Sequence, residues 1–119
     1  MRLQDKRAIV TGAGSGFGAG IARRFATEGA QVLLADIDED AARAVASETG
    51  QHAMVCDVSD GASVEALALQ AGKILGGVDI VVNNAGITHL PAPMETVSED
   101  DFDRVFAVNC KSVYLMARA

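Results

Sequence analysis

The chain has 119 residues, half of them hydrophobic, and a formal net charge of −6. This length predicts one domain, and an acidic chain without a basic cluster argues against nucleic-acid binding, because phosphate binding needs a basic face. No apolar run approaches the roughly 20 residues that cross a bilayer, and the N-terminus lacks the apolar stretch of a signal peptide, so we expect a cytoplasmic protein without membrane partners.

The chain starts with a short apolar strand that leads into a glycine cluster. Residues 8–10 (AIV) form a continuous apolar run, which predicts a strand buried on both faces, as in a parallel sheet. After the glycines, Phe17 and Ile21 recur at helical spacing, and Gly29 predicts the end of that helix. Residues 31–36 (QVLLAD) predict the second strand.

The alternation of strand and helix then continues. Asp38 is a predicted helix N-cap, and Gly50 ends that helix. Ser59 or Ser63 is expected to open the following helix, which Gly76 closes. Two further strands are predicted at residues 52–56 (HAMVC) and 79–82 (DIVV).

A loop and one more helix follow the fourth strand. Pro91 and Pro93 forbid regular helix in the loop, and Ser98 with Asp101 three residues later resembles a capping box. The last helix is predicted to carry Phe102, Val105, Phe106, Val113 and Met116 on its apolar face.

Strands that alternate with helices at short spacing predict right-handed parallel βαβ units with helices on both faces of the sheet. The expected fold class is therefore α/β, a doubly wound Rossmann-type parallel sheet, truncated after the fourth strand and the helix that follows it. Residues 1–119 would form one incomplete dinucleotide-binding domain. Ligands of such folds bind beyond the carboxyl ends of the strands.

The segment Thr11–Gly18 (TGAGSGFG) joins the first strand to the first helix. A dinucleotide pyrophosphate must approach backbone N–H groups that a Cβ would block, and a helix N-terminus adds partial positive charge. The spacing is T-G-x-x-x-G-x-G rather than G-x-G-x-x-G, and no Lys followed by Ser or Thr comes after the glycines, which excludes a P-loop. A glycine turn that binds nothing is the alternative. The cofactor-binding residues predicted here are Gly12, Ser15, Gly16, Phe17 and Gly18.

Asp36 ends the second strand, 18 residues after Gly18 (36 − 18). A carboxylate at this place accepts hydrogen bonds from the adenosine ribose hydroxyls and repels a 2′-phosphate. Its neighbours Ser15 and Ile37, both predicted to contact the cofactor, carry no charge that could balance a phosphate. The expected cofactor is therefore NAD rather than NADP. The alternative is that Asp36 only caps the following turn, a task that Asp38 can perform.

Together, the glycine segment, Asp57-Val58 and the run NNAG at residues 83–86 resemble the short-chain dehydrogenase/reductase family. The resemblance covers the whole chain, although the family's fold has seven strands and four are predicted here. It implies that Asp57 bonds the adenine amino group, with the backbone of Val58 nearby. It also implies that Asn84, Ala85 and Gly86 lie against the cofactor and steady the central sheet. From the residues alone, these would be a helix-preceding Asp, a core Val and an ordinary turn.

Asn109 follows Phe102 and Phe106 at i+7 and i+3, which places it on the apolar face of the last helix. A buried amide without a partner costs roughly 1–3 kcal/mol, so we expect a bonding partner. The resemblance implies a catalytic position, where the family's Asn kinks its helix and holds a water linked to the catalytic lysine. The alternative is a structural Asn bonded to backbone.

The resemblance implies hydride transfer between nicotinamide and an alcohol or carbonyl substrate, with a Tyr-x-x-x-Lys pair as acid and base. The only tyrosine, Tyr114, has Arg118 four residues on. Arg keeps its proton, and this helix precedes the fifth strand, so Tyr114 is instead predicted to be an interface or core aromatic. His89 is expected at most to graze the substrate region, and Cys56 and Cys110 to be reduced core thiols rather than metal ligands.

The leading hypothesis is an N-terminal fragment of an NAD-dependent oxidoreductase, inactive alone and a dimer or tetramer at full length. One alternative is a stand-alone NAD-binding module or half of a split enzyme, and another is an NADP-dependent 3-oxoacyl thioester reductase. A purely structural protein would leave the glycine turn and Asp36 unexplained. In the truncated chain, residues 80–82 are expected to form an apolar edge open to aggregation.

Overall fold

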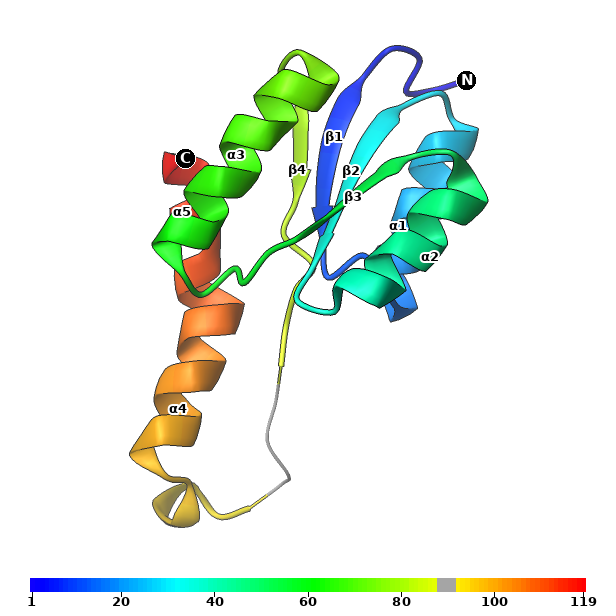
Figure 1. Ribbon diagram of the computed structural model, residues 1–119. Coiled ribbons are helices and arrows are strands. Elements are labelled where there is room, and N and C mark those ends of the chain that lie inside the picture. Colours follow the sequence, from blue (N-terminus) through cyan, green and yellow to red (C-terminus); the bar gives the residue numbers. More distant parts are fainter. Residues whose placement is uncertain (88–91) are drawn as a thin grey trace.

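The structure is a computed structural model that describes residues 1–87 and 92–119 (Figure 1). Four strands alternate with helices in the predicted order, and the strand at residues 31–36 is confirmed at both ends. The elements are β1 (Arg7–Thr11), α1 (Gly16–Thr27), β2 (Gln31–Asp36), α2 (Glu39–Thr49), β3 (His52–Val55), α3 (Gly61–Leu75), β4 (Ile80–Val82), the 3₁₀-helix η1 (Met94–Thr96), α4 (Glu99–Phe106), the π-helix η2 (Ala107–Lys111) and α5 (Ser112–Arg118). None of the helices in the described ranges is both long and apolar enough to span a bilayer.

The strands form one parallel sheet in the order β3-β2-β1-β4. β1 is central, and its Ile9 pairs with Leu33 of β2 and with Val81 of β4. The predicted doubly wound α/β class is confirmed. Because the strand order reverses between β1 and β4, ligands of such a fold bind beyond the carboxyl ends of these two strands. Within the described residues β4 is an edge strand, and Val81 is 39% exposed.

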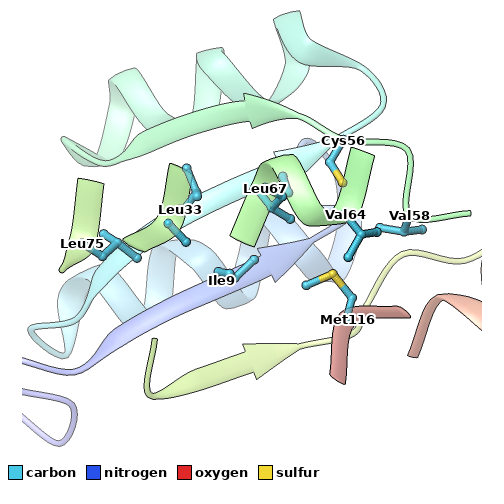
Figure 2. Close-up of a cluster of buried hydrophobic side chains, with 10 residues drawn as sticks. Ile9, Leu33, Cys56, Val58, Val64, Leu67, Leu75 and Met116 are labelled. Atoms are coloured by element: carbon cyan, nitrogen blue, oxygen red, sulfur yellow. The ribbon is translucent and has the colours of Figure 1, made fainter. Parts of the chain in front are cut away.

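Helices cover both faces of the sheet, with α1 and α2 on one side and α3 and α5 on the other (Figure 1). Alternate residues of β2 therefore enter different cores. Leu33 packs with Leu67 of α3 and Met116 of α5 (Figure 2), whereas Leu34 joins the cluster that includes Val45 of α2. Burial on both faces explains why the strand reads as a continuous apolar run rather than an alternating one.

The helix caps confirm one prediction and correct another. The Asp38 side chain accepts a hydrogen bond from the Ala41 N–H at the start of α2, as expected. Helix α3 is opened by Asp60, not by Ser59 or Ser63, because the Asp60 carboxylate directly precedes the helix and reaches the Ala62 N–H. The two serines are engaged elsewhere, at the end of β3.

Helix α4 forms as its capping box predicts, but its apolar face does not pack against the sheet. Ser98 accepts from the Asp101 N–H, and the rings of Phe102 and Phe106 stack at a centroid distance of 6.4 Å. No residue of α4 is buried, and Phe102 is 63% exposed. Figure 1 shows the helix extending away from the sheet, which accounts for the unfilled apolar face.

Candidate functional site

A cavity of about 380 Å³ opens beyond the carboxyl ends of β1 and β4, where the strand order reverses. It is lined by every predicted cofactor-binding residue except Gly16 and Gly18. Residues that the sequence singles out at four separate places thus surround one space. Three lining residues were not predicted, namely Cys56, Ile87 and Val108.

The first and the last glycine of the turn, Gly12 and Gly18, are required by close packing. A Cβ on Gly18 would lie 2.1 Å from the Gly12 carbonyl oxygen, and one on Gly12 would lie 2.9 Å from Nδ2 of Asn84. Gly12 also has a φ of +62°, in the left-handed region that glycine favours. The turn therefore folds against the end of β4, and side chains at these two positions would push the two segments apart.

Ser15 and Phe17 of the turn line the cavity, and Gly16 between them is not packed against other residues. Gly16 has a φ of +55° and no atom within 4 Å of its would-be Cβ. Phe17 is 88% exposed, and Ser15 begins α1 without a side-chain hydrogen bond to the helix. The first N–H groups of α1 are consequently left without a side-chain cap at the cavity, an arrangement that favours an anion.

The Asp36 carboxylate is held by backbone N–H groups at both oxygens. The Gly14 N–H donates to Oδ2 at 2.8 Å, and the Asp38 N–H donates to Oδ1 at 2.9 Å. Asp36 therefore does order the turn that follows it, while Asp38 caps α2, so the two tasks coexist. Ile37 beside it is 71% exposed. Gly14, the residue that bonds Asp36, lies in the glycine segment but is not among the predicted cofactor-binding residues.

Asp57 and Val58 form the wall of the cavity that follows β3. Oδ1 of Asp57 accepts from the backbone N–H and from the hydroxyl of Ser59, at 3.0 and 2.6 Å. The Asp57 N–H donates to the hydroxyl of Ser63. Val58 is buried in the core next to α3. Both serines thus order the loop that carries Asp57, and this is why neither one caps α3.

Thr11 joins the ends of β1 and β4 directly before Gly12 of the cavity wall, and only its place in the glycine motif pointed to it. Its buried hydroxyl donates to the Val82 carbonyl and accepts from the N–H groups of Asn84 and Ala85. Nδ2 of Asn84 donates in return to the carbonyls of Thr11 and Gly12. The predicted role of Asn84 in steadying the sheet matches this network.

Asn109 lies in the π-helix η2, between α4 and α5. Its side chain is paired twice with Ile87: Oδ1 accepts from the N–H at 2.8 Å and Nδ2 donates to the carbonyl at 2.7 Å. The expected partner therefore exists and is backbone, but Asn109 is exposed rather than buried. It lines a second cavity of about 570 Å³ beside α4, not the one at the glycine turn.

The comparisons with known proteins agree with this geometry. A family model described as short chain dehydrogenase matches residues 6–119. The chain belongs to the short-chain dehydrogenase/reductase family. Its relatives include the 4-formylbenzenesulfonate dehydrogenase of Comamonas testosteroni, 50% identical over 99% of this chain and 49% of that protein, and the D-threitol dehydrogenase of Mycolicibacterium smegmatis, 42% identical over 99% of this chain and 47% of that protein. A 3-ketoacyl-(acyl-carrier-protein) reductase from Brucella melitensis, solved in complex with NADH, is 47% identical, with a TM-score of 0.95 over 98% of this chain and 48% of its own.

The chain spans about half the length of the curated relatives it matches. As a member of this family of oxidoreductases, it has a fold that takes nicotinamide cofactors. The cavity at the glycine turn fits such a group, since it combines uncapped helix N–H groups, the Asp36 carboxylate and open space beside Ser15 and Phe17.

The structure also shows where several other residues discussed above lie. Tyr114 is 57% exposed, not a core aromatic, and accepts from Arg118 at 3.3 Å. Cys56 is buried, which raises the pKa of its thiol, but Cys110 is exposed, contrary to the expectation of two core thiols. His89 lies outside the described residues. Among residues 1–87 and 92–119 there is no cluster of three metal-ligating side chains.

Proposed function

We propose that the chain is the cofactor-binding part of an NAD-dependent oxidoreductase that transfers a hydride between nicotinamide and an alcohol or carbonyl carbon. One observation carries the proposal: the Asp36 carboxylate and the glycine turn open into the same cavity at the point where strand order reverses. A pyrophosphate needs the N–H groups of such a turn, and an adenosine ribose needs an acceptor at the end of the second strand.

Each wall of the cavity takes one part of the dinucleotide in this proposal. The N–H groups of Ser15 to Gly18 bind the pyrophosphate, and Asp36 accepts from the ribose hydroxyls beside Ile37. Asp57 bonds the adenine amino group, next to the backbone of Val58. Residues 84–86 lie against the nicotinamide half of the cofactor, whose ring supplies or accepts the hydride when bound.

The charge at the ribose subsite favours NAD over NADP. A 2′-phosphate would approach the Asp36 carboxylate, and like charges at contact distance repel strongly in a partly desolvated site. Neither Ser15 nor Ile37 supplies a cation to balance it. The NADH in the similar Brucella structure supports the same preference.

Asn109 is proposed to act by positioning Ile87 and the π-turn rather than by contacting the cofactor. Its two hydrogen bonds fix Ile87, which lines the cavity, against the π-turn of the helix. Single π-turns occur often at functional sites, because they redirect backbone carbonyls. With its side chain engaged, a backbone carbonyl of this turn is the group left to hold a water in the proton relay.

The tyrosine and lysine of the reaction belong, in this proposal, to a part of the protein beyond residue 119. Residues 1–119 then form one incomplete dinucleotide-binding domain without turnover of its own, and the whole protein is a dimer or tetramer. The 47% sequence identity with a 3-ketoacyl reductase favours 3-oxoacyl thioesters as a second substrate class beside simple alcohols and carbonyls. Assaying the whole protein with polyols, aromatic aldehydes and a 3-oxoacyl thioester distinguishes these classes.

The cofactor is tested by titrating the purified chain with NADH and NADPH, following nucleotide fluorescence. We expect NADH to bind more tightly, and Asp36→Ala to lower NADH affinity by about tenfold or more, as for the loss of hydrogen bonds to a charged group. Tighter binding of NADPH by the wild-type chain would refute the argument from Asp36.

A further inference from the structure

The carboxylate of Asp36 has little freedom to turn. Its Oδ2 accepts from the Gly14 N–H at 2.8 Å, and its Oδ1 accepts from the Asp38 N–H at 2.9 Å. Both donors are backbone groups, one on the glycine turn and one at the start of α2. Rotation of the carboxylate about its side-chain bonds would break both charge-assisted hydrogen bonds at once.

The space around Gly14 admits no side chain. A Cβ there would lie 2.8 Å from Cβ of Ala41, 2.9 Å from Oδ2 of Asp36 and 3.1 Å from the backbone N of Ala42. The start of α2 cannot move away freely, because the Asp38 cap fixes it through Ala41. The Asp36 side chain is therefore the neighbour of Gly14 that a Cβ would displace most readily.

We propose that Gly14 is a positioning residue that sets the preference for NADH over NADPH by holding the Asp36 carboxylate towards the ribose subsite. The inference rests on the proposed function. A carboxylate oxygen has two acceptor directions, so each oxygen keeps one for the cavity after bonding its backbone donor. Two acceptors match the two hydroxyls of an adenosine ribose, and a carboxylate held in place cannot swing away from an incoming 2′-phosphate.

The test compares Gly14→Ala with Gly20→Ala, a matched control on the exposed side of α1 where a new Cβ meets no atom within 4 Å. The measured quantity is the ratio of the Kd for NADPH to the Kd for NADH, obtained from fluorescence titrations of the purified chain. We expect G14A to lower this ratio by about tenfold, an effect of about 1.4 kcal/mol, and G20A to leave it unchanged.

A double-mutant cycle with Asp36→Ala separates positioning from general damage. Because Gly14 acts through Asp36, adding G14A to D36A should leave the ratio where D36A alone puts it. A G14A effect of equal size in both backgrounds, or an equal loss of affinity for both dinucleotides, overturns the inference.

A second measurement needs no substitution at Gly14 and so does not depend on the folding of G14A. In nuclear magnetic resonance spectra of the chain without cofactor, D36A should move the Gly14 amide proton upfield and speed its exchange, while the Gly20 amide stays in place. An unmoved Gly14 amide overturns the inference. If the wild-type chain binds neither dinucleotide, the proposed function fails as well, whereas NADH binding with an unchanged G14A ratio removes this inference alone.

Discussion

Two regions of the molecule differ in whether their apolar residues are buried. The first is the sheet with α1 to α3, and the second is α4. In the first region, Leu33 and Leu67 are fully buried between the sheet and α3, and alanines and valines fill the other face. In the second, Phe102 and Phe106 stack on each other and stay more than half exposed. Local signals are enough to form a helix in both regions, but burial needs a partner surface, which only the first region has among the described residues.

The difference in burial predicts very different costs for two truncations, Leu33→Ala and Phe102→Ala. Leu33→Ala should lower the free energy of unfolding by about 2–5 kcal/mol, because it leaves a cavity in the core. Phe102→Ala should change it by less than about 0.5 kcal/mol, as for an exposed residue. Urea denaturation of both variants measures this, and an equal loss in both would show that α4 is packed in solution.

A second test compares two glycines of the first region. Gly18→Ala should cost about 3 kcal/mol, because the new Cβ meets the Gly12 carbonyl oxygen and forces the turn apart. Gly20→Ala, in open space on the same helix, should instead stabilise by about 0.5–1 kcal/mol through helix propensity. The same denaturation experiment distinguishes them, and a stable Gly18→Ala protein would contradict the close packing of turn and strand.

A third test addresses the link between the two regions, where Asn109 holds Ile87. Asn109→Ala should lower stability by about 1–2 kcal/mol and speed hydrogen exchange at the Ile87 amide. Asn109→Asp keeps the acceptor for this amide but loses the donor to the carbonyl, so its effect should be intermediate. Exchange at Ile87 that is the same in all three proteins would mean that the pair of hydrogen bonds does not form.

The smallest effect is expected at the opposite end of the sheet, where Asp79 binds Arg7. Hydrogen bonds from the Arg7 guanidinium and backbone N–H lower the pKa of the Asp79 carboxyl from 3.8 to about 2. A carboxyl with a lower pKa in the folded state stabilises the fold fully above about pH 4 and loses this contribution as the pH falls towards 2. The Asp79→Asn variant should therefore unfold at a lower temperature than wild type at pH 6, and the difference between the two unfolding temperatures should become small near pH 2.

Measuring the thermal unfolding of wild type and Asp79→Asn between pH 2 and pH 7 tests whether their unfolding temperatures approach each other at low pH. The pair is partly exposed, so its contribution should also shrink in salt. A difference between wild type and Asp79→Asn that persists unchanged to pH 2 would show that the asparagine acts through something other than lost charge.

Local patterns in the sequence were enough to predict the order of elements, the parallel sheet and several of the residues that meet at its carboxyl edge. Periodicity, glycine ends and N-caps are local signals, and the connection rules of parallel sheets convert them into one topology. This is why Gly12 and Asp36, distant in the chain, could be assigned to one site, whereas Asp57 and Asn84 were assigned to it through the family resemblance. The prediction of the α3 N-cap was wrong because Ser59, Asp60 and Ser63 can each cap a helix. Only the tertiary contacts of Ser59 and Ser63 with Asp57 show that Asp60 is the cap.

The backbone groups that these side chains bond, and the apolar faces that are covered, depend instead on contacts between segments far apart in the chain. The hydrogen bond between Gly14 and Asp36 joins residues 22 positions apart, and so does the pairing of Asn109 with Ile87. Such hydrogen bonds form only when two segments are placed to within a few tenths of an ångström, and the periodicity of each segment does not determine that placement. Exposure of α4 is decided in the same way, because an apolar stripe specifies that a helix can be buried, while the neighbouring elements determine whether it is.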